Sequence, residues 1–397
     1  MKKTKNQIFL RPELFCALAI FYFAGAVLSA ADLVMTSFDK CISVSGDSML
    51  VWLFGLGCFF AGSFAFSRIL LSLKGWKKWL PMVPGAGVVT AILYYMTGAG
   101  IFMSCLLSVS LALGSYLMFS SIRTEREVKR MFAFGLLCAM ISFILTGIPI
   151  MKIGMHYDIN LVLNPLFMLG IYSMLYSLVR MHESRPTVSR MLFMLPLLVS
   201  VLSTFRSIIA ISFMTWALTE ALRNGEGCGR KFAVSAAVSA AAVLVMFAFV
   251  NIGYANAVVS GNWPFNPVQM VEYRLAFTGS VFEKIIGISM PWGYAPGSTL
   301  EMPLGLLQGM LFYGVHSNLT STVFGEMMLE GGLPAVFLAM LFCGGFLGQL
   351  YKKDSGLYAL MMAHMIVAIE TGVNFFFLAV YFYIGYIALM ARGETSE

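Results

Sequence analysis

The sequence predicts an all-α polytopic membrane protein. Hydrophobic residues make up 59% of the 397 residues and charged residues only 11%, whereas soluble domains carry about 25% charged residues. Apolar runs of about 20 residues, the length that a helix needs to cross a bilayer, recur from end to end. The basic residues lie in short clusters between these runs, where they fix topology. The net charge of +7 therefore does not indicate a nucleic-acid-binding protein.

The apolar runs define the expected spans. They cover residues 14–36, 49–72, 80–97, 101–121, 131–151, 160–180, 191–222, 232–251, 332–350 and 357–391. The first run is longer than the 7–15 apolar residues of a secretory signal, so we expect an uncleaved first span. The runs 191–222 and 357–391 are too long for one crossing and have basic residues on both flanks, so each is expected to cross twice. Arg206 lies at the middle of the first of these, and Glu370 and Asn374 lie near the middle of the second.

The distribution of basic residues sets the expected topology. Crossing twice in both long runs gives about twelve spans with both termini in the cytoplasm. Of the 26 Lys and Arg residues, only Lys40, Lys152, Arg206, Arg274 and Lys284 then lie outside. We expect spans one to nine in residues 1–251, a large periplasmic loop with interfacial helices in 252–331, and three more spans with a cytoplasmic tail in 332–397.

The long connection 252–331 is expected to be functional. Loops of this length are usually functional or disordered, and this one is too apolar and aromatic for disorder. Its stretch 302–315 is apolar but too short to span, so it suits a helix at the membrane interface.

Three residues on the expected outer side make a candidate catalytic site. Arg206 is expected below the outer surface, where a guanidinium persists if it has an anionic partner or an aqueous cavity. Arg274 and His316 lie in the long loop. A lone histidine is more often structural, but this one shares a membrane face with two of the few outer arginines. Together the three side chains could hold a diphosphate and move a proton.

Other chemistries lack their motifs. The sequence has no GxxxxGK[ST], no GxGxxG opening a βαβ unit, no HExxH and no GxSxG. The seven cysteines show no CxxC pair, and the acidic residues of the long loop are dispersed. We therefore expect no disulfide framework, no metal site and no cofactor.

The order of these motifs resembles the O-antigen polymerase and O-antigen ligase superfamily. An Arg at an outer hairpin (203–207), Tyr273-Arg274-Leu275 early in one large loop and His316-Ser317-Asn318-Leu319 late in it carry the resemblance. The architecture covers most of the chain, and the motifs cover residues 203–334.

The resemblance implies a GT-C-like helical bundle in the bacterial inner membrane with its active site facing the periplasm. The implied donor is a glycan on undecaprenyl diphosphate, and the acceptor is a glycan or the lipid A core. In this interpretation Arg206 and Arg274 clamp the diphosphate and His316 activates or positions the acceptor hydroxyl. The implied partners are membrane lipids and a chain-length regulator. The further substrate-binding candidates are Tyr273, Ser317, Asn318, Glu326 and Glu330.

The motifs leave alternatives open. Ligases commonly place a Gly-x-x-Gly soon after the His-Asn pair, whereas here Gly325-Glu326 and Glu330-Gly331-Gly332 form a longer pattern more like that of repeat-unit polymerases. Phe205 replaces the small polar residue often found before the first Arg, a departure from both groups. A transporter of an anionic substrate is the lower-ranked alternative, since no pair of corresponding broken helices marks two halves. We favour a metal-independent polymerase over a ligase.

Overall fold

A computed structural model describes most of the chain and supports the predicted fold class. It describes residues 11–32, 44–98, 100–122, 124–148, 163–203, 206–224, 267–294, 296–297, 304–314, 319–372 and 375–393. Every regular element within these ranges is a helix. The predicted ninth span, 232–251, and the first part of the predicted loop lie outside the described residues.

The helices confirm a polytopic membrane protein. Five described segments are long and apolar enough to cross a membrane, namely Glu13–Ala30, Gly46–Ser72, Ile101–Ser121, Glu125–Thr146 and Gly325–Lys353. Further apolar helices are shorter, among them Ser355–Thr371. The number of about twelve crossings stays a prediction.

The chain divides into two compact units. Unit 1 comprises Met1–Arg11, Ser121–Pro264 and Asp354–His364, and unit 2 comprises Pro12–Ser120, Phe265–Lys353 and Met365–Glu397. Each unit is therefore built from segments that are distant in the sequence.

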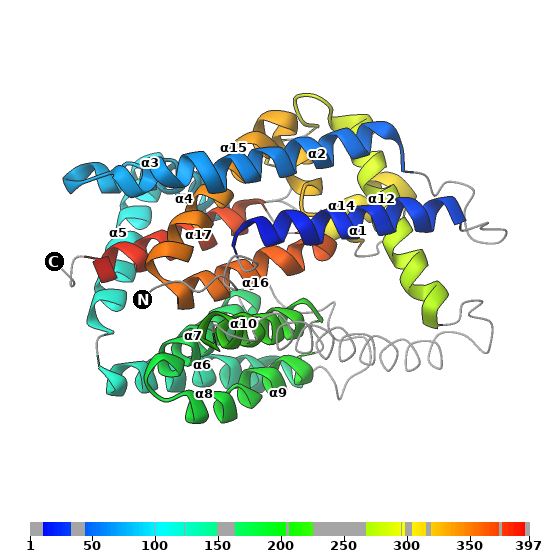
Figure 1. Cartoon of the computed structure of the whole chain (residues 1–397). Coiled ribbons are helices and arrows are strands. Elements are labelled where there is room, and N and C mark those ends of the chain that lie inside the picture. Colours follow the sequence, from blue (N-terminus) through cyan, green and yellow to red (C-terminus); the bar gives the residue numbers. More distant parts are fainter. Residues whose placement is uncertain are drawn as a thin grey trace. The chain divides into compact units, whose positions relative to one another are not determined.

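Unit 1 is a helical bundle, of which α7 to α10 are drawn in green in Figure 1. Its helices are α6 (Glu125–Thr146), α7 (Leu163–Ser184), α8 (Pro186–Leu192), α9 (Met194–Leu202), α10 (Arg206–Asn224) and the first part of α16 (Ser355–Thr371). The contact between α6 and α7 depends on two glycines. A Cβ atom on Gly135 would lie 2.6 Å from the carbonyl oxygen of Gly170, and one on Gly170 would lie 2.7 Å from that of Gly135. Small residues thus allow the backbones to approach closely, as is common between membrane helices.

Both runs that were expected to cross twice are interrupted at the expected places. The run 191–222 is divided between α9, which ends at Leu202, and α10, which begins at Arg206. The run 357–391 is divided between α16, which ends at Thr371, and α17 (Phe375–Gly393). Each interruption lies beside the polar residues noted in the middle of the run.

Unit 2 contains the larger share of the long apolar helices. Its elements are α1 (Glu13–Asp32), α2 (Gly46–Ala61), the π-helical turn η2 (Gly62–Phe66), α3 (Ser67–Ser72), the 3₁₀ turn η3 (Gly75–Trp79), α4 (Met82–Thr97), α5 (Ile101–Ser121), α12 (Pro267–Ser289), α14 (Leu304–Tyr313), α15 (Gly325–Lys353), the second part of α16, and α17. The helix α14 occupies the stretch in which an interfacial helix was expected. The long helix α12, drawn in yellow-green in Figure 1, lies within the predicted loop, in a stretch where the sequence analysis located no helix.

Glycines and aromatic rings hold unit 2 together. Gly344 and Gly348 of α15 pack against the backbone of α2 and η2, and a Cβ atom on Gly348 would lie 2.7 Å from the carbonyl oxygen of Ser63. The ring of Trp52 on α2 stacks between Phe23 of α1, 4.2 Å away, and Phe282 of α12, 5.7 Å away. This stack fixes α12 against the helices at the start of the chain.

A kink divides α15. Gly331 and Gly332 have non-helical backbone angles, with φ of 61° at Gly332, a left-handed conformation that glycine adopts at little cost. Leu333 N donates to the carbonyl oxygen of Pro291 at 2.9 Å. The break coincides with the predicted boundary between the loop and the following span.

Candidate functional site

Arg274 is the centre of a polar cluster in unit 2. It lies on α12, where its Nε donates to Oε1 of Glu370 at 2.8 Å. Its Nη2 donates to Oγ1 of Thr320 at 2.6 Å. The hydroxyl of Thr278, one helical turn after Arg274, lies 3.5 Å from that of Thr320. A guanidinium, a carboxylate and two hydroxyls thus meet at one place.

The position of Glu370 is set by the end of α16. Glu370 is in the last turn of this helix, which is followed by Gly372 with φ of 69°. Gly372 N donates to the carbonyl oxygen of Ala368 at 3.0 Å. A Cβ atom on Gly372 would lie 2.8 Å from the carbonyl oxygen of Ser321, the residue after Thr320. The helix end and the segment that carries Thr320 therefore fit together through a glycine.

The cluster is open enough to meet a ligand. The side chains of Arg274 and Glu370 are 32% and 33% exposed. A guanidinium binds phosphate oxygens through charge-assisted hydrogen bonds, often two at once, and hydroxyl groups add further donors. The chemistry of this cluster suits a phosphate-bearing ligand.

The other predicted members of the catalytic site cannot be placed beside Arg274. His316 and its neighbours Ser317 and Asn318 lie outside the described residues. Arg206 is the first residue of α10, in unit 1, and its side chain also lies outside the described part. The shared site of Arg206, Arg274 and His316 stays a prediction.

The remaining substrate-binding candidates have distinct environments. Tyr273 is partly exposed and its ring stacks on that of Phe277 at 5.5 Å. Glu326 is fully buried, and Glu330 is 5% exposed. The carboxylate of Glu330 accepts a hydrogen bond from Gly297 N, which ties the loop after α12 to the kink in α15. Their roles toward substrate stay predictions, and the contact of Glu330 is a structural one.

Sequence reasoning missed the partners of Arg274. Glu370 was noted as a polar residue in a long apolar run but not as a partner of Arg274. An ionisable residue within such a run is itself a signal of function, although it does not name its partner. Thr320 and Thr278 gave no signal, because single threonines are common in loops and helices.

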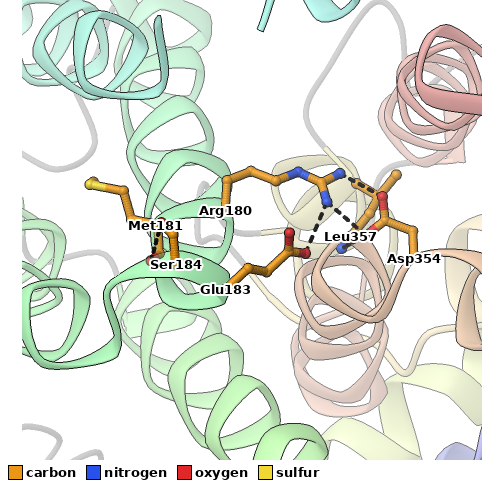
Figure 2. Close-up of polar contacts among 6 residues, drawn as sticks. All are labelled: Arg180, Met181, Glu183, Ser184, Asp354 and Leu357. Carbon is orange, nitrogen blue, oxygen red and sulfur yellow. Dashed lines mark hydrogen bonds and ion pairs between the residues drawn. The ribbon is translucent and has the colours of Figure 1, made fainter. Parts of the chain in front are cut away.

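Unit 1 contains a second arginine–carboxylate pair, shown in Figure 2. Nη1 and Nη2 of Arg180 donate to the two carboxylate oxygens of Asp354 at 3.0 and 2.5 Å. The side chains are only 7% and 1% exposed. Asp354 also accepts a hydrogen bond from Leu357 N at 3.0 Å and so caps the start of α16. This pair joins α7 to α16 and is closed to ligands.

A buried histidine lies close to this pair in the sequence. His182 is 2% exposed, and its Nε2 lies 3.6 Å from Oε1 of Glu220. Glu220 is itself paired with Arg190, and Arg223 donates to the carbonyl oxygen of His182. Burial lowers the pKa of His182 below its usual value, Glu220 partly opposes this, and Arg223 and Arg190 reinforce it.

Comparison with known families decides the assignment. A family model described as "Putative O-antigen polymerase" matches residues 11–384. The chain belongs to this family. Membership links it to O-antigen polysaccharide biosynthesis and to enzymes of the glycosyltransferase type, in agreement with the resemblance seen in the sequence.

Individual relatives add little to the family assignment. The uncharacterized protein MJ0420 of Methanocaldococcus jannaschii is 31% identical over 120 residues. The match spans 30% of this chain and 30% of that protein. No solved structure matches the chain. The GT-C-like bundle implied for this O-antigen polymerase family member therefore stays a prediction.

Proposed function

We propose that this protein is a membrane glycosyltransferase that joins lipid-linked oligosaccharide repeat units into O-antigen or a similar surface polysaccharide. The donor is a glycan on undecaprenyl diphosphate, and the acceptor is the glycan of a second such lipid. The observation that carries the proposal is the partly exposed side chain of Arg274, whose guanidinium is held by Glu370 and Thr320, in a chain of the O-antigen polymerase family.

Arg274 acts on the leaving group in this proposal. The acceptor hydroxyl attacks the anomeric carbon of the donor sugar, and the bond from that carbon to the diphosphate oxygen breaks. The electron pair of that bond passes to the diphosphate, whose charge grows in the transition state. A fixed guanidinium stabilises such charge without reorganisation. Arg206 is the second guanidinium, and with two of them the reaction needs no metal ion.

His316 is the proposed acceptor of the hydroxyl proton. A neutral imidazole can accept a proton near neutral pH. His316 precedes Thr320 by four residues, a stretch that spans at most about 14 Å when fully extended. Its place in the chain thus supports a role beside Arg274.

The proposed location is the periplasmic face of the bacterial inner membrane. Arg274 is among the few basic residues outside the predicted cytoplasmic clusters, and basic residues concentrate in cytoplasmic loops. The periplasm lacks nucleotide sugars and ATP, so the energy of the reaction must come from the lipid diphosphate. A chain-length regulator is the proposed protein partner.

A deletion strain tests the function. Removing the gene and separating the surface polysaccharide on a gel should leave lipid A core that carries one repeat unit. Bare core together with intact lipid-linked polymer would identify a ligase instead. An unchanged polymer ladder would overturn both assignments.

Complementation of the same strain tests the site. The wild-type gene should restore the ladder, and the Arg274→Ala gene should not, at equal protein levels in the membrane. Lys284→Ala is the matched control on the same helix. The ammonium of Lys284 lies 3.9 Å from the centre of the ring of Tyr313 and not in the polar cluster, so this variant should restore the ladder. Restoration by Arg274→Ala would remove Arg274 from the mechanism.

A further inference from the structure

Arg274 is held by a contact that a better ligand can replace. Among the described residues, its contacts with Glu370 and Thr320 engage two of the five N–H groups of the guanidinium. The ion pair is made through Nε, so Glu370 does not form the two-nitrogen fork that makes arginine–carboxylate pairs strong and specific. No other described residue engages the remaining donors, which could form a bidentate contact with an oxyanion.

The exposure of Arg274 and Glu370 also indicates a contact that a ligand can replace. About a third of each side chain is exposed, 32% for Arg274 and 33% for Glu370. The closed pair in unit 1 is instead 7% and 1% exposed. Part of the Arg274–Glu370 pair is therefore accessible from outside the fold, whereas the pair in unit 1 is closed.

Electrostatics makes the carboxylate and a diphosphate competitors. A diphosphate that contacts Arg274 comes within a few ångströms of Glu370, where like charges repel strongly in a partly dry site. The diphosphate carries more charge than the carboxylate and offers paired oxygens that match the guanidinium. It therefore wins the competition, but its affinity is reduced by the work of displacing Glu370.

We propose that Glu370 is a displaceable counter-ion of Arg274, which keeps the guanidinium in place between turnovers and yields it to the diphosphate of the lipid donor. The inference rests on the proposed function, because it takes the diphosphate lipid as the ligand. It makes Glu370 a positioning residue that limits how tightly donor and product are held. Its return to Arg274 assists the release of the lipid diphosphate product.

The test is the sign of a change in affinity. The full-length protein in lipid nanodiscs is titrated calorimetrically with farnesyl diphosphate and with inorganic pyrophosphate. Glu370→Gln removes the competing charge and keeps an oxygen for Nε, so it should bind both probes about tenfold more tightly. Glu370→Asp keeps the charge but withdraws it from Nε, so its affinity should lie between those of the wild type and Glu370→Gln.

Two matched variants separate this effect from general changes. Glu283→Gln makes the same chemical change on α12, where Glu283 accepts hydrogen bonds from Ser45 N and the hydroxyl of Ser48, and should leave the affinity unchanged. Thr320→Val removes the neutral contact to Nη2 and should not tighten binding. If Glu370→Gln does not fold, the sign of the change in Glu370→Asp decides.

The outcomes distinguish this inference from the proposed function. Tighter binding in the Glu370 variants supports a displaceable counter-ion. If the wild type binds both probes and the Glu370 variants bind them equally well or more weakly, the displaceable counter-ion is overturned. The donor assignment then stays intact. Absence of binding in every variant and in the wild type overturns both.

Discussion

Two arginine–carboxylate pairs in this chain contain the same chemical groups but differ in geometry and exposure. Arg180 and Asp354 form a two-nitrogen fork that is almost fully buried, and the aspartate also caps a helix. Arg274 and Glu370 meet through one nitrogen and are a third exposed. A buried charge that loses its partner is very costly, whereas a half-exposed one can exchange its partner for water or ligand. Geometry and exposure, rather than residue type, thus separate a structural pair from a pair suited to binding.

The largest effect is expected from breaking the closed pair. Asp354→Asn keeps the cap of α16 but removes the buried counter-ion of Arg180 and leaves only the more distant, exposed Glu183, which costs about 3–5 kcal/mol of folding free energy. Thermal unfolding in detergent should show a large drop in the midpoint. Glu183→Gln is the control, because this more exposed carboxylate lies 3.4 Å from Arg180 and should cost less than about 1 kcal/mol.

A double variant sharpens this test. Arg180→Met combined with Asp354→Asn removes both charges, so most of the lost stability should return. Equal unfolding midpoints for wild type and Asp354→Asn would show that the pair does not stabilise unit 1.

The open pair should respond in activity rather than in stability. Arg274→Lys keeps the charge but cannot form a two-nitrogen contact with phosphate, so turnover of lipid-linked repeat units should fall about 100-fold. The unfolding midpoint should barely move, because partly exposed pairs contribute about 1 kcal/mol or less. Full-length polymer from this variant at normal protein levels would exclude two-nitrogen recognition.

A smaller effect is expected from the glycine that positions Glu370. Gly372→Ala places a Cβ atom close to the carbonyl oxygen of Ser321 at a left-handed backbone position. This change should lower the free energy of unfolding by about 1–2 kcal/mol. The shift of the helix end should also change the affinity for farnesyl diphosphate. Gly57→Ala, within α2, whose Cβ atom would meet nothing within 4 Å, should not lower the stability and should leave the affinity unchanged. A harmless Gly372→Ala would mean that the helix end does not depend on this close approach.

The smallest effect concerns the buried histidine of unit 1. The pKa of His182 is lower in the folded protein than its usual value, so below about pH 6.5 the unfolded chain binds more protons than the folded one. The contribution of His182 to the free energy of unfolding is therefore present at pH 7 and declines as the pH falls toward 5. His182→Gln should flatten that decline by about 1 kcal/mol or less, as measured by unfolding midpoints between pH 7 and 5. Parallel curves for the two proteins would exclude His182 as a source of acid sensitivity.

Hydropathy and charge predicted much of the fold because a bilayer restricts the length and composition of the helices that can cross it. The interruptions near Arg206 and Glu370 were expected, since apolar runs too long for one crossing contained polar residues at their middles. The helix α12 was missed. Its Glu272, Arg274, Glu283 and Lys284 lower its hydropathy, and a membrane-span criterion overlooks a helix of mixed character.

The site was predictable only in part. The motif order pointed to Arg274, but Glu370 follows it by 96 residues and Thr320 by 46. Pairings over such separations depend on how helices pack, which hydropathy does not encode. The Arg180–Asp354 pair, separated by 174 residues, escaped prediction for the same reason.

The close packing of α15 on α2 has a consequence for the way the protein is made. Gly344 and Gly348 fit the backbone near Gly62, yet 263 residues lie between the end of α2 at Ala61 and the start of α15 at Gly325. The helix α2 therefore enters the bilayer long before α15 is synthesised. Membrane helices insert individually and associate afterwards. The small-residue face near Gly62 is therefore covered by lipid until the C-terminal helices arrive. A nascent chain arrested before α15 retains its early helices in the bilayer without the contact that joins them to the rest of unit 2, and membrane quality-control proteases would meet it in that state.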